Sequence, residues 1–114
     1  MEIEFVGAAQ TVTGSMHLLR AGGKTFSFDC GLFQGRRAEG IERNSHFPIP
    51  PEKLDILLLS HAHIDHSGLV PKLVKAGFGG PIYATPATAD LLMTELLRAG
   101  LATTRECCRI RNRR

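Results

Sequence analysis

Three histidines and an aspartate lie within six residues of one another, directly after a short apolar run. The run covers residues 56–59, and the polar side chains that follow it are His61, His63, Asp65 and His66. Imidazole nitrogens and carboxylate oxygens are ligands that suit zinc, manganese or iron. A lone histidine is usually an ordinary surface or core residue, but four potential ligands behind a buried strand are typical of a metal site.

The geometry at the end of a strand explains how these ligands could share metals. Residues two apart point the same way in an extended chain, so His61 and His63 can bind one cation. Asp65 and His66 follow where the backbone turns into a helix, and there they can face a second cation. Two metals roughly 3.5–4 Å apart can share a hydroxide and hold both oxygens of an in-line displacement. We therefore predict hydrolysis with two divalent metal ions, and we favour zinc.

The segments around the motif predict an α/β fold. Initial β-strands are expected over residues 2–6, from the loop at residues 7–14 to about residue 19, and over 25–29, with a hairpin connection at 20–24. Residues 36–53 are expected to form a surface excursion with one or two helical turns.

A βαβα unit is expected from residue 55 to residue 98. Apolar spacing predicts a helix that starts just after His66, with Pro71 in its first turn. A second helix should be capped by Thr85 and run to about Arg98. Such a unit implies parallel pairing of its two strands.

Composition places the basic charge outside the expected fold. The net charge is +3, but residues 105–114 carry five arginines and one glutamate, whereas residues 1–104 carry 9 basic and 10 acidic side chains. This gives almost no support for a nucleic-acid surface on the folded part. Cys30, Cys107 and Cys108 form no paired disulfide framework, and a zinc site built from them has little support. No run approaches a membrane span, so we expect a cytoplasmic protein of one domain at most.

Several motifs together resemble one known family. His61-Ala-His63-Ile-Asp65-His66 is similar to the HxHxDH signature of the metallo-β-lactamase superfamily. Residues 5–15, 29–35, 60–73 and 80–89 resemble its β-CASP RNA-processing branch. The likeness covers about residues 1–97, which would form the N-terminal portion of an αββα sandwich. Residues 98–114 are an atypical basic tail, and we expect a premature or frame-shifted end there.

The resemblance implies a metal-dependent hydrolase that cleaves RNA phosphodiester bonds. An aspartate at the place of Asp29 would orient metal-binding histidines by accepting the far ring N–H, and Asp65 could also take a proton from the attacking water. For Asp29, a plain turn carboxylate is the alternative. The signature itself is shared with hydrolases of thioesters and lactones, and four ligands alone would also fit a catalytically incomplete metal-binding fragment.

Family members carry further parts that are not found in this sequence. These are additional metal ligands, the other half of the sandwich and an inserted domain that clamps RNA. The sheet and helix faces that the absent half would cover should therefore be exposed. We expect the missing C-terminal half or a partner chain to be needed to cover the core.

Overall fold

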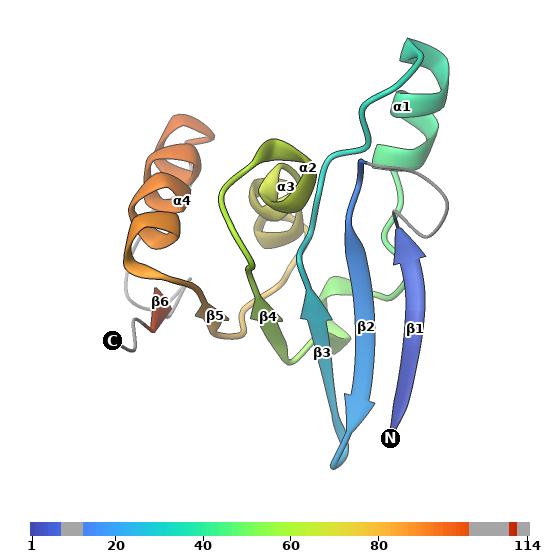
Figure 1. Ribbon diagram of the computed structural model, residues 1–114, viewed down its shortest axis with the longest axis vertical. Coiled ribbons are helices and arrows are strands. Elements are labelled where there is room, and N and C mark those ends of the chain that lie inside the picture. The colour runs from blue at the N-terminus through green and yellow to red at the C-terminus, as the bar shows by residue number, and fades with distance from the viewer. Residues whose placement is uncertain (8–12, 101–109, 112–114) are drawn as a thin grey trace.

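A computed structural model of the protein describes residues 1–7, 13–100 and the backbone of residues 110–111, which form one mixed sheet flanked by helices (Figure 1). The six strands follow chain order across the sheet. They are β1 (Glu2–Gly7), β2 (Met16–Ala21), β3 (Lys24–Phe28), β4 (Ile56–Leu58), β5 (Ile82–Tyr83) and β6 (Ile110–Arg111). Neighbours from β1 to β3 are antiparallel, and those from β3 to β6 are parallel. The predicted α/β class and the predicted parallel pairing of β4 with β5 are both confirmed.

A two-residue glycine turn explains the antiparallel start of the sheet. Gly22 and Gly23 have positive φ angles of 58° and 75°. Ala21 pairs with Lys24 on either side of them, so the turn joins β2 directly to β3. Only glycine enters this left-handed region without a steric cost, and such turns match the twist of hairpin strands. The predicted hairpin is confirmed.

The helices agree with the sequence except at the histidine motif. They are α1 (Arg37–Asn44), the short 3-10 helix η1 (Pro51–Lys53), α2 (Ile64–Ser67), α3 (Val70–Lys75) and α4 (Pro86–Arg98). The predicted helix with Pro71 in its first turn is α3, which starts at Val70 and not directly after His66. The separate short helix α2, which already begins at Ile64, was not predicted. Pro71 accounts for the break between α2 and α3, since its ring would clash with the carbonyl of Ser67 in a continuous helix.

Helix α4 begins and ends where the sequence predicts. The hydroxyl of Thr85 accepts the backbone N–H of Thr88 at 3.4 Å, and Pro86 occupies the first turn. Both features satisfy the requirements of a helix start, where backbone N–H groups lack helical partners.

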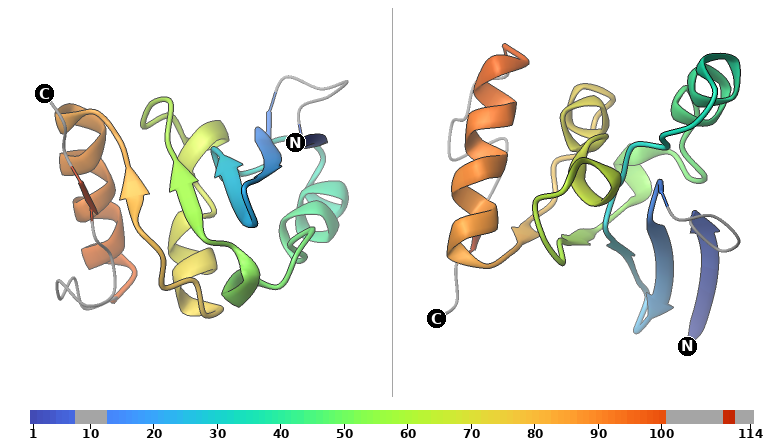
Figure 2. Two further views of the ribbon diagram at one scale, coloured as in Figure 1. Left: turned by 90° about the horizontal axis from the view of Figure 1, so that it is seen from below. Right: turned by 45° about the horizontal axis from the view of Figure 1, so that its top comes forward.

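The hydrophobic core lies on one face of the sheet. Strand register places Leu18, Ser27, Leu57 and Ile82 side by side on β2 to β5, and each is 0% exposed. Helices α3 and α4 lie over this face (Figure 2) and contribute the buried residues Val70, Leu73, Leu92 and Leu96. The interior therefore lies between the sheet and these two helices.

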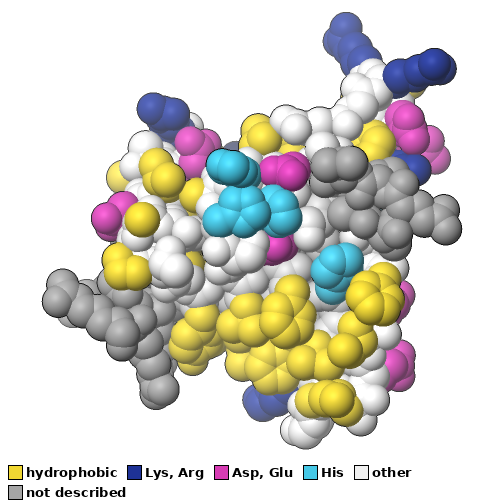
Figure 3. Space-filling view, viewed as in Figure 1, with side chains coloured by type: hydrophobic (Ala, Val, Ile, Leu, Met, Phe, Trp, Pro, Cys, Tyr) yellow, Lys and Arg dark blue, Asp and Glu magenta, His cyan; other side chains and the backbone are white. Residues whose placement is uncertain are grey.

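Within the described ranges, no helix covers the opposite face of the sheet, and we call this the bare face. One row of paired residues crosses five strands on this side: Phe5, His17, Phe28, Leu58 and Tyr83. Phe5 is 67% exposed, Ile3 54% and Phe28 40%. Hydrophobic side chains accordingly gather over the strands on the visible side (Figure 3). The expected exposure of a sheet face is confirmed.

No strand is predicted from the sequence after Arg98, but the structure adds one. Ile110 and Arg111 of β6 pair in parallel with Ile82 and Tyr83 of β5. Cys107 and Cys108 lie outside the described residues, so the absence of a zinc site there stays a prediction. None of the helices in the described ranges has the length and apolar character that a membrane span requires.

Residues 60–66, which we call the histidine loop, are held by backbone hydrogen bonds from the segment after β3. Cys30 donates its N–H to the carbonyl of His66 at 2.8 Å, and Leu32 donates to that of Ile64 at 3.0 Å. Between them, Gly31 lies so close that an added Cβ would be 1.7 Å from the carbonyl oxygen of Asp65. Glycine is required at residue 31 for this approach.

Gly31→Ala should therefore destabilise the fold by about 3 kcal/mol, because backbone atoms cannot move aside as a flexible side chain can. The measurement is the free energy of unfolding from urea denaturation. Gly79→Ala is the matched control, since nothing lies within 4 Å of its added Cβ, and it should change stability by no more than about 0.5 kcal/mol. Equal effects of the two substitutions would contradict this account of the loop.

Candidate metal centre

The histidine loop follows the carboxyl end of β4 and places three potential ligands together. One donor atom each from His61, His63 and Asp65 lies within 4.8 Å of the others. Histidine side chains gather on the surface above the apolar side chains of the bare face, next to acidic ones (Figure 3). Two imidazoles and a carboxylate at this separation fit a divalent transition metal, so the donor set agrees with the predicted site.

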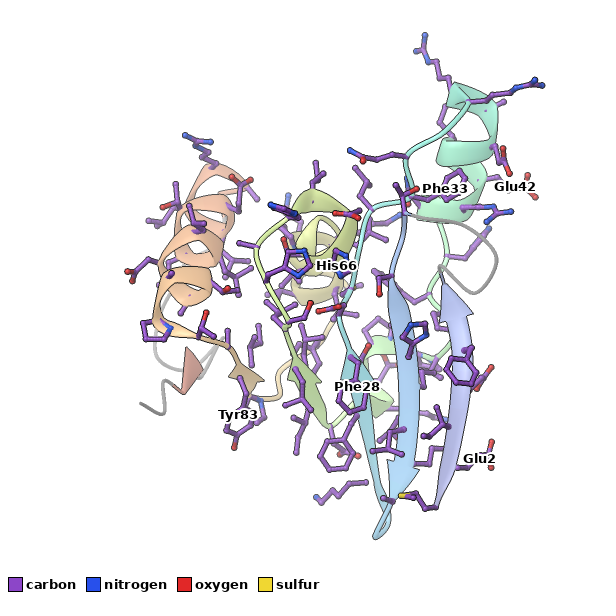
Figure 4. All side chains as sticks on the ribbon, in the orientation of Figure 1. Glu2, Phe28, Phe33, Glu42, His66 and Tyr83 are labelled. Atoms are coloured by element: carbon purple, nitrogen blue, oxygen red, sulfur yellow. The ribbon has the colours of Figure 1, made fainter. Side chains whose placement is uncertain are left out.

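The fourth predicted ligand lies beside these three. His66 Nε2 is 3.4 Å from Asp65 Oδ2, and the ring centroids of His66 and His61 are 4.0 Å apart. His66 is labelled in Figure 4, where its side chain extends from α2, above the end of β4. The structure thus brings all four residues together. The division into His61 with His63 on one metal, and Asp65 with His66 on another, stays a prediction.

Asp29 connects the end of β3 to the histidine loop. Its φ of 64° is in the left-handed region, which aspartate tolerates better than most residues. Its N–H donates to the Leu58 carbonyl at 2.8 Å, and its carboxylate accepts the Ser60 N–H at 2.7 Å. This turn buries the side chain, which is 9% exposed, and directs it at the ligands.

The carboxylate of Asp29 also contacts His66. Asp29 Oδ2 is 2.8 Å from His66 Nδ1. An ionised carboxylate can only accept, so the ring donates from Nδ1 and keeps Nε2 free as a metal ligand. The contact predicted for Asp29 is present, and its role toward a metal stays a prediction.

Ser60 is a further residue of the site that sequence reasoning did not single out. Its hydroxyl donates to Asp29 Oδ2 at 2.8 Å and lies 2.9 Å from His61 Nδ1. The sequence signal that could have identified Ser60 is its position between the strand and His61. The contacts of its hydroxyl with Asp29 and His61 could not be predicted, because they depend on Asp29, which is distant in sequence.

Cys30 is a buried neighbour of the site. Its side chain is 0% exposed. Burial, together with the adjacent Asp29 carboxylate, raises the pKa of the Cys30 thiol to about 12. Cys30 is therefore a neutral thiol in the folded protein and not a thiolate ligand.

The two remaining histidines lie away from the centre. His17 is on the bare face, where its ring meets that of Phe5 edge-on at 5.3 Å. Within the described ranges, His17 Nδ1 is buried and lacks a hydrogen-bond partner. His46 is exposed and borders a separate cavity next to α1. Among the described residues, the ligand cluster includes neither of them.

A cavity adjoins the histidine loop on the side of α4. It has a volume of about 200 Å³, and its lining includes Ile64, Pro71, Leu91, Leu92 and Glu95. The walls come from α2, α3 and α4, so the loop that carries the ligands also forms one side of a hollow. A substrate held at the metal centre would have an apolar neighbour here.

Comparison with known proteins gives consistent matches. Residues 10–103 match the family described as the Metallo-beta-lactamase superfamily. Ribonuclease TTHA0252 of Thermus thermophilus is 48% identical over 101 residues, which are 89% of this chain and 23% of the relative. Transcription termination factor FttA of Methanosarcina mazei is 35% identical over 95 residues, 82% of this chain and 15% of the relative. Integrator complex subunit 11 of Danio rerio is 36% identical and covers 73% of this chain and 15% of the relative.

Two solved structures share the fold. Human tRNase Z, short form, superposes with a TM-score of 0.63 at 17% identity, over 98% of this chain and 45% of that one. The metallo-beta-lactamase fold protein YhfI of Bacillus subtilis superposes with a TM-score of 0.63 at 23% identity. The match covers 98% of this chain and 46% of YhfI. The chain thus spans less than half of these structures and at most about a quarter of the curated relatives named above.

The raised pKa predicts that Cys30 resists alkylation. At pH 8, a thiol with a pKa near 12 is ionised in about one molecule in ten thousand, against about a quarter for an ordinary thiol. In a Cys107→Ser, Cys108→Ser variant, Cys30 should react with iodoacetamide at least about a hundredfold more slowly in the folded state than in urea. Because only the unfolded thiol ionises readily, stability should also fall as the pH rises above about 9. Rapid labelling of the folded chain would contradict this burial.

Proposed function

The chain belongs to the metallo-beta-lactamase superfamily, and on this premise we propose that it carries part of the active site of a two-metal hydrolase that cleaves RNA phosphodiester bonds. The observation that carries the proposal is the cluster of His61, His63 and Asp65 donor atoms within 4.8 Å. His66 lies beside the cluster, with Nδ1 2.8 Å from Asp29 Oδ2 and Nε2 turned toward Asp65, 3.4 Å from its Oδ2.

The relatives support RNA as the substrate. The resemblance to the β-CASP RNA-processing branch is confirmed by a ribonuclease, the FttA factors and an Integrator subunit. These names favour RNA over a thioester or lactone, for which no residue of the site gives support. The chain covers only 23% and 15% of the first two relatives, so the activity of a whole protein is part of the proposal.

The chain's own residues would have distinct tasks. We assign His61, His63, Asp65 and His66 to hold the metals, and Asp29 to fix His66 through Nδ1. Two divalent ions, when bound, supply electrophilic stabilisation of the phosphoryl oxygens. Asp65, the carboxylate of the cluster, would accept a proton from the attacking water. Zinc as the metal, the pairing of ligands and a cytoplasmic location are predictions from the sequence.

A catalytically incomplete metal-binding fragment is the second candidate. The observation that favours it is the origin of the ligands, since all four lie within the six consecutive residues 61–66. A two-metal centre in a closed cavity needs more protein donors than one loop provides. Both candidates predict that the chain binds metal, but the incomplete fragment would not cleave RNA.

Metal affinity and RNA cleavage by the purified 114-residue chain test the proposal. We expect zinc binding, with His63→Ala and Asp65→Ala each lowering zinc affinity at least about tenfold. Any metal-dependent cleavage of an RNA oligonucleotide by the chain should be lost in both variants. Competition with a chromogenic chelator measures the affinity. Cys107→Ala is the control and should leave both properties unchanged.

Three outcomes are distinguishable. Cleavage that persists in both ligand variants would contradict the assigned site. Zinc binding that depends on His63 but produces no cleavage would favour the incomplete fragment. Equal loss of affinity in His63→Ala and Cys107→Ala would show that binding does not occur at the histidine loop.

We also propose that the bare face is covered in the working protein by a further part of a longer chain or by a partner chain. The support is the row across five strands, in which every residue except His17 is apolar or aromatic, with Phe5 67% exposed and Phe28 40% exposed. Contiguous exposed apolar surface on this scale is typical of an interface. The helices already cover the other face, so a second sheet with its own helices would complete the four layers of an αββα sandwich.

The isolated chain should consequently self-associate and bind the apolar dye ANS. A Phe5→Lys, Phe28→Lys variant should reduce both properties, as measured by light scattering after size exclusion and by dye fluorescence. Ile41→Lys is the control, because Ile41 is 64% exposed on α1, outside the sheet. A monomeric wild-type chain that binds no dye would contradict the need for a cover.

A further inference from the structure

We propose that Ser60 is a positioning residue that holds His61 in the tautomer with a free Nε2, so that this nitrogen is available to the metal. The inference rests on the proposed metal centre and adds a residue to it. Its basis is the chain of contacts from a buried carboxylate, through a hydroxyl, to the first histidine of the loop.

Two contacts with Asp29 fix the side chain of Ser60. Its backbone N–H donates to Asp29 Oδ1 at 2.7 Å, and its hydroxyl donates to Oδ2 at 2.8 Å. Two bonds to one buried carboxylate determine both the backbone and the rotamer of Ser60. The oxygen of the hydroxyl is thereby held at a defined place beside His61.

Proton counting then decides the tautomer of His61. Ser60 Oγ lies 2.9 Å from His61 Nδ1. A hydroxyl has one proton, and in Ser60 this proton is given to the carboxylate, which can only accept. The contact with the ring therefore requires Nδ1–H of His61 to donate to Oγ. A neutral imidazole protonated at Nδ1 has its lone pair on Nε2.

Asp29 thus serves two histidines by different routes. It contacts His66 Nδ1 directly at 2.8 Å and reaches His61 through Ser60. Removal of the Ser60 hydroxyl breaks only the second route, since the bonds from Asp29 to His66 and to the Ser60 N–H remain. A general loss of structure would disturb both histidines, whereas loss of the positioning contact should disturb His61 alone.

The direct test is the tautomer of each ring in the metal-free chain, read from long-range ¹H–¹⁵N NMR correlations at pH about 8, where an ordinary imidazole is neutral. We expect wild-type His61 and His66 both to be protonated at Nδ1. Ser60→Ala should shift His61 toward the Nε2-protonated form and leave His66 unchanged. Ser60→Thr keeps the hydroxyl and should restore the wild-type signals.

Ser67→Ala is the matched control. Ser67 is on the same stretch of chain, but its hydroxyl donates only to the backbone carbonyls of Ala62 and His63, at 3.2 and 3.1 Å. This variant should leave the His61 tautomer as it is in the wild type. Zinc affinity, measured by chelator competition, should fall about tenfold in Ser60→Ala and recover in Ser60→Thr.

Several results would overturn the proposal. They are an Nε2-protonated His61 in the wild type, an unchanged His61 in Ser60→Ala, or equal shifts of His61 and His66 in that variant. The wild-type spectrum by itself identifies the His61 tautomer, so the proposal can be tested even if Ser60→Ala fails to fold. Because the tautomers are read without metal or RNA, the failure of hydrolysis would leave this result standing, and the reverse also holds.

Discussion

The site depends on one buried carboxylate held in an unusual backbone conformation. Asp29 adopts a φ of 64° at the end of β3, which directs its side chain across to the histidine loop. There it accepts hydrogen bonds from Ser60 and His66. A buried carboxylate without such donors would be costly, so the loop and Asp29 stabilise each other. The ligands are thereby ordered by the protein itself, before any metal contributes.

Much of the fold could be predicted because each local signal agreed with the global arrangement. Two adjacent glycines predicted the hairpin, and Thr85 followed by proline predicted the start of α4. Pro71 correctly predicted a nearby helix start, which is that of α3. The separate helix α2 was not predicted, because four residues are too few to show an apolar periodicity. Strand β6 had no signal, since its two residues become a strand only by pairing with β5.

The ligand residues were predictable for a similar reason, and their supporting contacts were not. His61, His63, Asp65 and His66 are neighbours in sequence, so their spacing alone indicates a shared task. Ser60 and Asp29 are 31 residues apart, and their hydrogen bonds exist only because β3 and β4 pair in parallel. A single sequence contains no direct signal for such a contact. For Asp29, the family resemblance supplied what the spacing could not.

The end of strand β3 contributes to both the bare face and the metal centre. Phe28, its last residue, lies on the bare face, and the next residue, Asp29, contacts the ligands. Any molecule that orders the end of β3 by packing on Phe28 would also favour the carboxylate geometry that the ligands need. Reciprocity of binding free energies then requires that bound metal strengthen this packing by the same factor. Quaternary assembly and metal binding would in that case be thermodynamically coupled, so that each would favour the other.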